Sequence, residues 1–476
     1  MLHLARRAAL ALAFIALCGG HAAAQPSLSP DDISRIDASV LKMLDATHAP
    51  GAAIAVEKDG VLVYTKAYGT TDAAGRTDIT TQTQFEIGSI TKQFTAAAIM
   101  QLAEAGKLKL SDKLAKYVPE YTAGKNVTIR QLLNQISGIP DYTEVPSFLQ
   151  AATTQPGSVA AILKLVQGKP LNFRPGTEWQ YSNTNYILLG RIVERASGQT
   201  YDAYLRKHVL DAAGMSNTVT IADEGALKDF PTGYNRHKGQ FIAAPRFGAK
   251  WAWSAGYLVS TVGDLIKWDD AFFGGKIVPM RDVALMTSPG HLRSGAATNY
   301  GFGWLLDKEN GHKRVWHNGG TFGFAAANML YPDEHLTIVV LLNDAEAPPS
   351  QAVAARIFEA LHPQEVAAAA KGVPGEDLAV TARAKDWIHR MVTGAAIDRT
   401  QLTKEMSDAL TPQLLASAKA QMAPLGDPAS FTFKGVEPDG HGNKNYLYRV
   451  VFPAATLTLY FGLQPDGKIS TILFKA

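Results

Sequence analysis

Cysteine is almost absent from this sequence. The 476 residues include one, Cys18, which lies in an N-terminal stretch that we expect to be removed from the mature chain. A mature chain without cysteine has no disulfide, no thiol nucleophile and no cysteine-based metal site. A core of this size folds without such cross-links. We expect neither a metal nor any other cofactor.

A strong excess of charge of either sign is also missing. The net charge is +3, and it falls to +1 if Arg6 and Arg7 are removed with the N-terminus. A nearly neutral chain is not expected to bind nucleic acid. Beyond the N-terminus there is no long hydrophobic run. The short apolar stretch 337–342 predicts a buried strand, so we expect no membrane segment in the mature chain. The sequence leaves the oligomeric state open.

Residues 1–24 have the pattern of a signal peptide. Arg6-Arg7 is followed by an apolar stretch, 8–18, and then by three alanines, 22–24. The apolar stretch is too short to span a bilayer. We expect cleavage after Ala24 and a secreted or periplasmic protein, exported by the general secretory route rather than the twin-arginine route.

The chemistry begins at Ser89-Ile90-Thr91-Lys92, which precedes an apolar segment that predicts a buried helix. Helical residues i and i+3 share a face, about 5–6 Å apart at Cβ, so Ser89 and Lys92 point into the same space. Burial lowers the pKa of a lysine, which can then act as a base toward a serine. Free N–H groups at the helix start suit an oxyanion. Alone, this short pattern is weak, because it also arises by chance.

Two later motifs could complete such a site. Tyr181-Ser182-Asn183 follows a Pro-Gly pair, which predicts a loop before a helix over 186–196. It either brings the Tyr181 phenol near Ser89 and lets Asn183 bind a carbonyl group, or it is only a helix cap.

The second motif, His317-Asn318-Gly319-Gly320, lies between two strand-like segments. Glycine in a strand often marks the close approach of a ligand or another backbone. The alternative is a plain hairpin turn built on Asn318-Gly319.

Together, the three motifs resemble those of the penicillin-recognising serine hydrolases. That superfamily includes class C β-lactamases, D-alanyl-D-alanine carboxypeptidases, D-aminopeptidases and related esterases. Its pattern is Ser-x-x-Lys, then Tyr-x-Asn, then Lys/His-Thr/Ser-Gly. The resemblance covers about residues 30–362. Segments that support it are Leu132–Pro140, Pro175–Thr177, Leu188–Gly190, Gly214–Met215, Ser254–Gly256 and Tyr300–Trp304.

The resemblance implies an α+β fold, with an antiparallel sheet flanked by helices and a helical subdomain. Loops over 141–169 and 223–250 would form the walls of the cleft. The implied catalytic residues are Ser89 as acylated nucleophile with Lys92 and Tyr181 in proton transfer; the implied substrate contacts are Asn183, His317, Asn318 and Gly319; and the implied oxyanion hole uses the backbone N–H groups of Ser89 and Gly320.

The third motif departs from the lactamase pattern, which usually has Lys-Thr-Gly. A lysine provides a fixed positive charge for a substrate carboxylate, whereas a histidine of ordinary pKa, about 6.5, is largely neutral at pH 7. Asn318 also lacks the hydroxyl group that could bind that carboxylate. This departure disfavours β-lactam antibiotics, which are anionic.

We therefore predict a secreted serine hydrolase that acts through an acyl-serine intermediate. Its substrates would be small molecules or peptides: D-amino-acid peptides or small esters and amides. Two alternatives remain open, a class C-like β-lactamase and a non-catalytic binder of cell-wall fragments. A binder would tolerate loss of the catalytic residues, and Ser89, Lys92 and Tyr181 are all present.

Length predicts more than one domain. We expect a hydrolase domain over 25–362 that ends in a helix over 350–361, a linker over 363–376, and a small α+β domain over 377–476 that resembles the cone-shaped modules of some secreted serine hydrolases. Helices are predicted over 378–393 and 400–422, and strands over 446–452, 457–463 and 468–474.

Overall fold

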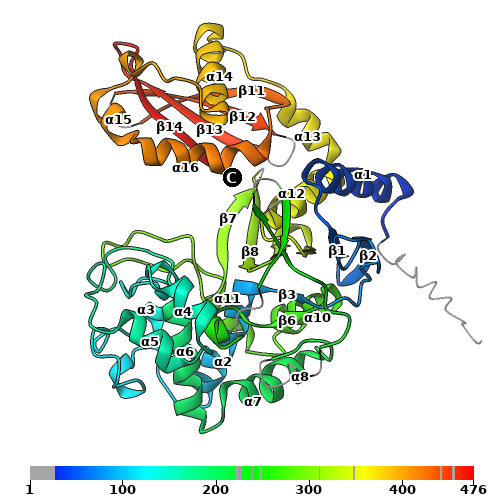
Figure 1. Cartoon of the computed structure of the whole chain (residues 1–476), viewed down its shortest axis with the longest axis vertical. Coiled ribbons are helices and arrows are strands. Elements are labelled where there is room, and N and C mark those ends of the chain that lie inside the picture. The colour runs from blue at the N-terminus through cyan, green and yellow to red at the C-terminus, as the bar shows by residue number, and fades with distance from the viewer. Residues whose placement is uncertain are drawn as a thin grey trace, which may run out of the picture.

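The computed structural model describes residues 27–475 except 221–224, 226, 238–239, 246–248, 310, 347–348, 440–441 and 453–455. The predicted signal peptide, residues 1–24, lies outside these described residues. The chain forms one unit around a six-stranded sheet and a second around a four-stranded sheet (Figure 1). None of the described helices is both long enough and apolar enough to cross a membrane.

The large sheet is antiparallel throughout. One of its strands runs straight through the glycine-rich stretch and turns only at residues 322–323, so the hairpin-turn alternative for Asn318-Gly319 is wrong. The strands lie side by side in the order β2-β1-β10-β9-β8-β7. Along the chain they are β1 (Gly51–Lys58), β2 (Val61–Gly69), β7 (Leu305–Glu309), β8 (His312–Thr321), β9 (Phe324–Tyr331) and β10 (Leu336–Leu342).

Both faces of this sheet are covered by helices. Successive side chains of a strand point to opposite faces, and β1 illustrates the result. Ile54 packs with α1 (Pro30–Thr47) and α12 (Ser350–Leu361), whereas Ala55 belongs to the core that contains α2 (Thr91–Glu104) and α10 (Val262–Phe273). The buried strand and the helix predicted over 337–342 and 350–361 are confirmed as β10 and α12.

A mainly helical region lies on the inner face of the sheet, the face that packs against α2 and α10 (Figure 1). The helix predicted over 186–196 is confirmed and starts three residues earlier. The elements here are α3 (Ile129–Leu133), α4 (Phe148–Thr154), α5 (Val159–Val166), α6 (Asn183–Ser197), α7 (Tyr201–Leu205), α8 (Asp211–Ala213), α9 (Trp253–Gly256) and α11 (Met280–Met286), with two small sheets made by β3 (Phe85–Glu86) with β6 (Val259–Ser260) and β4 (Tyr234–His237) with β5 (Gln240–Ala243).

The C-terminal unit packs helices on an antiparallel sheet. The predicted continuous helix over 400–422 is wrong: a proline has no N–H to donate and disfavours a helical residue before it, so Pro412 starts a new helix. A strand over 430–438 was not predicted, and part of the expected linker is helical. The elements are α13 (Pro363–Ala370), α14 (Leu378–Thr393), α15 (Lys404–Ala409), α16 (Pro412–Met422), β11 (Ser430–Pro438), β12 (Lys444–Val451), β13 (Thr456–Leu463) and β14 (Ile469–Lys475), with strand order β11-β12-β13-β14.

Two arginines and a glutamate join the units. On α12, Arg356 donates to the carbonyl oxygen of Phe452 at 2.9 Å and pairs with Glu359 at 2.5 Å. The second carboxylate oxygen of Glu359 accepts from Arg449 of β12 at 2.8 Å. All three charged side chains are at least 85% buried. Helix α12 therefore covers one face of the large sheet and also binds the C-terminal unit.

Replacing Glu359 should weaken this junction. Glu359→Ala leaves two buried guanidinium groups without their counter-charge, and we expect it to lower the free energy of unfolding by about 3 kcal/mol. Asp386→Ala is the matched control, because Asp386 forms an exposed ion pair with Arg390 and its loss should cost about 0.5 kcal/mol or less. Urea unfolding followed by circular dichroism measures both, and equal effects would contradict the role given to Glu359.

Candidate active site

Ser89 lies in a tight turn between β3 and the buried helix α2. The turn is a 3₁₀ segment, η1 (Gly88–Ile90), that runs directly into α2. Gly88 has a φ of +51°, a left-handed conformation that glycine adopts without steric cost. A Cβ atom there would also lie 2.6 Å from the backbone nitrogen of Gly320 in β8. Glycine at position 88 therefore lets the turn carrying Ser89 lie directly against the strand.

Lys92 is fully buried one helical turn after Ser89. Its Nζ atom lies 2.8 Å from Ser89 Oγ, 2.8 Å from Asn183 Oδ1 and 2.7 Å from the carbonyl oxygen of Ala255. Burial lowers the pKa of Lys92 to about 7, while the charge of Asp141 raises it and partly offsets this effect. A neutral amine has two N–H groups and a lone pair. It can donate to Asn183 and Ala255 and still accept the proton of Ser89.

Asn183 is oriented by a carboxylate on its other side. Its Nδ2 atom donates to Asp141 Oδ2 at 2.9 Å, and its backbone N–H donates to the same oxygen at 3.2 Å. With its NH₂ group held there, the amide presents its oxygen to Lys92. Ser182, not Asn183, is the N-cap residue of α6, and the Ser182 side chain makes no capping hydrogen bond. The helix-cap alternative for Asn183 is therefore wrong.

The Tyr181 ring packs against the lysine, with Lys92 Nζ 4.8 Å from its centre. The phenol oxygen is buried and has no partner at normal hydrogen-bond distance among the described residues, although the Ser89 hydroxyl is close enough to lower its pKa. Burial is the larger effect and raises the pKa of Tyr181 well above 10. The phenol stays protonated at neutral pH, which makes it a proton donor rather than a base.

His317 is 2% exposed, and both of its ring nitrogens have partners. Nδ1 lies 2.6 Å from the carbonyl oxygen of Asn318, and Nε2 lies 3.0 Å from the Tyr300 hydroxyl. A carbonyl oxygen can only accept, so Nδ1 carries the proton and Nε2 accepts from Tyr300. Burial, together with the charge of Lys92, lowers the pKa of His317 to about 3. His317 is therefore neutral at physiological pH and has no free nitrogen for a substrate.

Gly319 lets strand β8 lie directly against η1, the turn that carries Ser89. A Cβ atom on Gly319 would lie 1.9 Å from the carbonyl oxygen of Ile87 and 3.0 Å from the backbone nitrogen of Ser89. This close approach is possible only without a side chain. The backbone nitrogens of Ser89 and Gly320 both lie at this contact between η1 and β8, and both residues line the same cavity.

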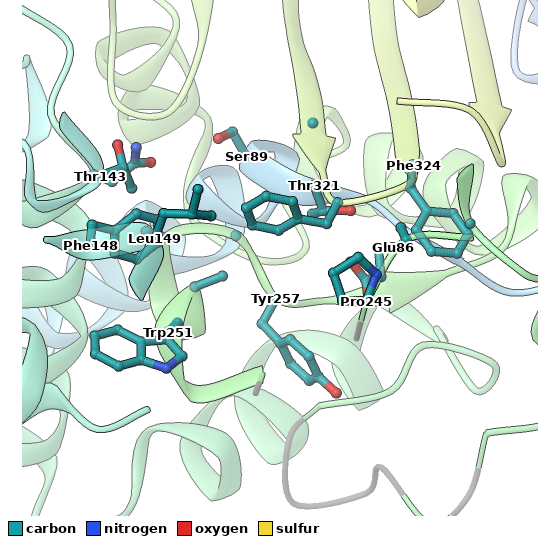
Figure 2. A pocket seen from close by; sticks show the side chains of 18 of the residues that line it. Glu86, Ser89, Thr143, Phe148, Leu149, Pro245, Trp251, Tyr257, Thr321 and Phe324 are labelled. Atoms are coloured by element: carbon teal, nitrogen blue, oxygen red, sulfur yellow. The ribbon is translucent and has the colours of Figure 1, made fainter. Parts of the chain in front are cut away.

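A cavity of about 820 Å³ opens at Ser89 (Figure 2). Asn183 and Gly320 also line it, and both segments expected as cleft walls, 141–169 and 223–250, contribute lining residues. Lys92 and His317 lie behind this surface, packed around the Tyr181 ring. Asn318 and Gly319 are not among the described lining residues.

Three groups at the site were not predicted from the sequence. Asp141 holds Asn183, Tyr300 holds His317, and the Ala255 carbonyl accepts from Lys92. Tyr300 and Ala255 lie within segments that carry the family resemblance, and Asp141 directly follows one. The family resemblance therefore pointed to these segments, but only the folded chain shows which partner each group contacts.

Comparison with known proteins places the site in a known context. The family profile described as Beta-lactamase matches residues 36–362. Protein flp of Staphylococcus aureus (strain MW2) is 30% identical over 66% of this chain, and the chain spans 64% of that protein's length, just under two thirds. Penicillin-binding protein 4* of Bacillus subtilis (strain 168) is 27% identical over 65% of this chain and 71% of its own.

Solved structures show the same fold. The octameric penicillin-binding protein homologue from Pyrococcus abyssi covers 93% of this chain and 95% of its own with a TM-score of 0.64 at 22% identity, so this likeness extends into the C-terminal unit. A D-stereospecific amidohydrolase from Streptomyces sp. covers 68% of this chain and 97% of its own with a TM-score of 0.59 at 25% identity. The predicted fold class is confirmed.

The contact at Gly319 yields a testable consequence. Gly319→Ala forces β8 away from the nucleophile turn and separates the Ser89 and Gly320 nitrogens. We expect the rate at which a fluorophosphonate probe labels Ser89 to fall by about 100-fold, the usual effect of losing one oxyanion donor. Gly263→Ala is the control, because a Cβ on that helical glycine meets no atom within 4 Å. Similar labelling rates in the two variants would show that the contact is unimportant.

Proposed function

This chain belongs to the beta-lactamase family, a superfamily of serine hydrolases, and we propose that it cleaves D-amino-acid peptides or small esters and amides through an acyl-serine intermediate. One observation carries the proposal: the amine of Lys92, with a pKa of about 7, lies 2.8 Å from the Ser89 hydroxyl. A serine becomes nucleophilic when a base of suitable pKa is at hydrogen-bond distance.

Acylation starts with neutral Lys92. Its lone pair takes the Ser89 proton as Oγ forms a bond to the substrate carbonyl carbon. The carbonyl electrons move onto oxygen, where the N–H groups of Ser89 and Gly320 stabilise the negative charge. When the carbonyl re-forms, the bond to the leaving group breaks. The leaving group takes a proton that comes from Lys92 by way of the Tyr181 phenol.

Deacylation repeats these steps with water as the nucleophile. Water gives its proton to neutral Lys92 and attacks the ester carbon, and Ser89 Oγ leaves with a proton. Tyr181 is suited to passing protons because burial keeps its phenol protonated. Asn183 has two roles in this proposal. Its side-chain oxygen accepts a hydrogen bond from the Lys92 amine and so orients it, and the residue lies on the cavity surface where a substrate amide would bind.

Substrate class is supported by two separate observations. The Streptomyces relative is described as a D-stereospecific amidohydrolase, which favours D-amino-acid amides and peptides. The neutral His317 supplies no positive charge at the third motif, which disfavours the lactamase alternative. The assembly of Ser89, Lys92 and Tyr181 around one proton path favours an enzyme over a non-catalytic binder.

Domain limits and location complete the proposal. We assign the hydrolase to residues 25–362 and a separate small domain to 377–476, joined by 363–376. The residue pattern of 1–24 supports export with cleavage after Ala24, which puts the mature protein in the periplasm or outside the cell.

Covalent labelling tests the nucleophile. A fluorophosphonate probe should form its adduct on the peptide that contains Ser89, and Ser89→Ala should abolish labelling. Ser182→Ala is the matched control: this serine belongs to the neighbouring motif, and its hydroxyl has no hydrogen-bond partner among the described residues. Peptide mapping by mass spectrometry gives the site. An adduct on another residue, or full labelling of Ser89→Ala, would remove the basis of the proposal.

The pKa of Lys92 predicts the pH dependence. Only the neutral amine accepts a proton, so kcat/KM for a neutral ester should rise with pH through an apparent pKa near 7, by about tenfold per pH unit below it. Asp141 raises the pKa of Lys92, so Asp141→Asn should shift the curve to lower pH. Initial rates between pH 5 and 9, corrected for uncatalysed hydrolysis, measure both. A curve that falls with pH would exclude Lys92 as the base.

A further inference from the structure

The cavity beside Ser89 is large and mainly apolar. Its volume of about 820 Å³ falls within the range of sites that hold drug-sized ligands. The side chain of an alanyl group would leave most of this space unfilled. The cavity extends from Ser89 between two walls of aromatic and aliphatic side chains (Figure 2).

One wall is an ordered aromatic cluster. Phe148 on α4 makes edge-to-face contacts with Tyr142, at 5.3 Å between ring centres, and with Trp251, at 5.9 Å. The Tyr142 hydroxyl donates to the carbonyl oxygen of Trp251, and the Trp251 indole donates to the carbonyl oxygen of Gln155 at 3.0 Å. Because polar ends of these rings are satisfied inside the protein, the wall presents apolar surface to the cavity.

The opposite wall is built in the same way. Phe324, at the start of β9, contacts Phe85 at 6.3 Å and Phe230 at 5.2 Å between ring centres. At the rim, Leu149 is 58% exposed and Phe322 is 37% exposed. Large apolar side chains exposed at the mouth of an apolar cavity are typical of a surface that a ligand covers.

Charged side chains are scarce in the described lining of the cavity. Among the described residues that line it, no lysine, arginine or histidine is present, and the one charged side chain is the carboxylate of Glu86. Lys92 lies behind the lining, and its charge is partly lost at pH 7. Against these described residues, a substrate carboxylate would lose its hydration without gaining a cation.

We propose that the acyl part of the substrate is bulky and apolar and carries no negative charge: an aromatic or medium-length aliphatic acyl group, presented as an ester or an amide. This inference rests on the proposed acyl transfer at Ser89 and names the acyl group that Ser89 accepts. The bond between the acyl carbon and the leaving group breaks, and the acyl group, held between the two walls, is then released by water as a carboxylic acid.

A series of nitrophenyl esters tests the inference on the full-length protein. The acyl groups are acetyl, butyryl, hexanoyl and octanoyl, together with the half-ester of adipic acid, which matches hexanoyl but ends in a carboxylate. Each kcat/KM is divided by the rate of hydroxide-catalysed hydrolysis. We expect about a threefold rise per added methylene from acetyl to hexanoyl, and at least about tenfold discrimination against the adipoyl half-ester.

The rim residue Leu149 gives a directed variant. Leu149→Arg places a cation at the mouth of the cavity and should raise the ratio of adipoyl to hexanoyl turnover by about fivefold, an effect that salt reduces. Leu149→Ser should lower the ratio of hexanoyl to acetyl turnover. Leu414→Ser, at a leucine 49% exposed on α16, should leave both ratios at the wild-type value.

The outcomes separate this inference from the proposed function. If no ester is hydrolysed and Ser89 takes no fluorophosphonate label, the proposed function fails. If Ser89 is labelled and esters are hydrolysed, but acetyl is as good as hexanoyl or the adipoyl half-ester is preferred, the proposed function stands and the inference is overturned. The same ranking should hold for amides, with D-phenylalanine nitroanilide cleaved faster than D-alanine nitroanilide.

Discussion

The burial of one amine governs this site. Lys92 has no contact with solvent, so every hydrogen bond of its amine must come from the protein, and Ser89, Asn183 and Ala255 supply three acceptors. An isolated buried charge is costly, and the amine responds by a lowered pKa rather than by gaining a bound counter-ion. Asp141 approaches through Asn183 and limits that shift. The balance leaves an amine that is about half neutral near pH 7.

The need to give the buried Lys92 amine hydrogen-bond partners also explains how the fold is arranged around the site. The acceptors come from η1, α6 and α9, three elements far apart in the sequence, and they meet on the inner side of the large sheet. Strand β8 closes the group from the other side. Burial and the charge of Lys92 keep His317 of this strand neutral, although the hydrogen bond to the carbonyl oxygen of Asn318 acts in the opposite direction and raises its pKa. A second positive charge next to Lys92 would lower the lysine pKa further, so the neutral state of His317 is consistent with a Lys92 pKa that stays near 7.

Local patterns predicted those parts of the protein that depend on local physics. Apolar runs and alternation located β10 and most of the C-terminal strands, and the i, i+3 spacing placed Lys92 beside Ser89. Helix α12 was expected from the family resemblance. The continuous helix over 400–422 was wrong because apolar content outweighed the effect of Pro412. Strand β11 was missed because its alternation is short and is interrupted by the register shift between Phe433 and Gly435. Asp141 and Tyr300 act on partners 42 and 17 residues away, so their roles depend on tertiary contacts that spacing does not reveal.

The contact between two glycine-lined backbones at the nucleophile turn has one more consequence. Gly88 and Gly319 let the main chain of η1 touch the main chain of β8, and the N–H groups of Ser89 and Gly320 are positioned by that contact. Main-chain groups held in this way have no rotamers to lose when a substrate arrives, whereas a side-chain donor would have to be immobilised at a cost of about 0.5–1.5 kcal/mol. Most of that conformational entropy is lost once, during folding, and is not lost again in each turnover.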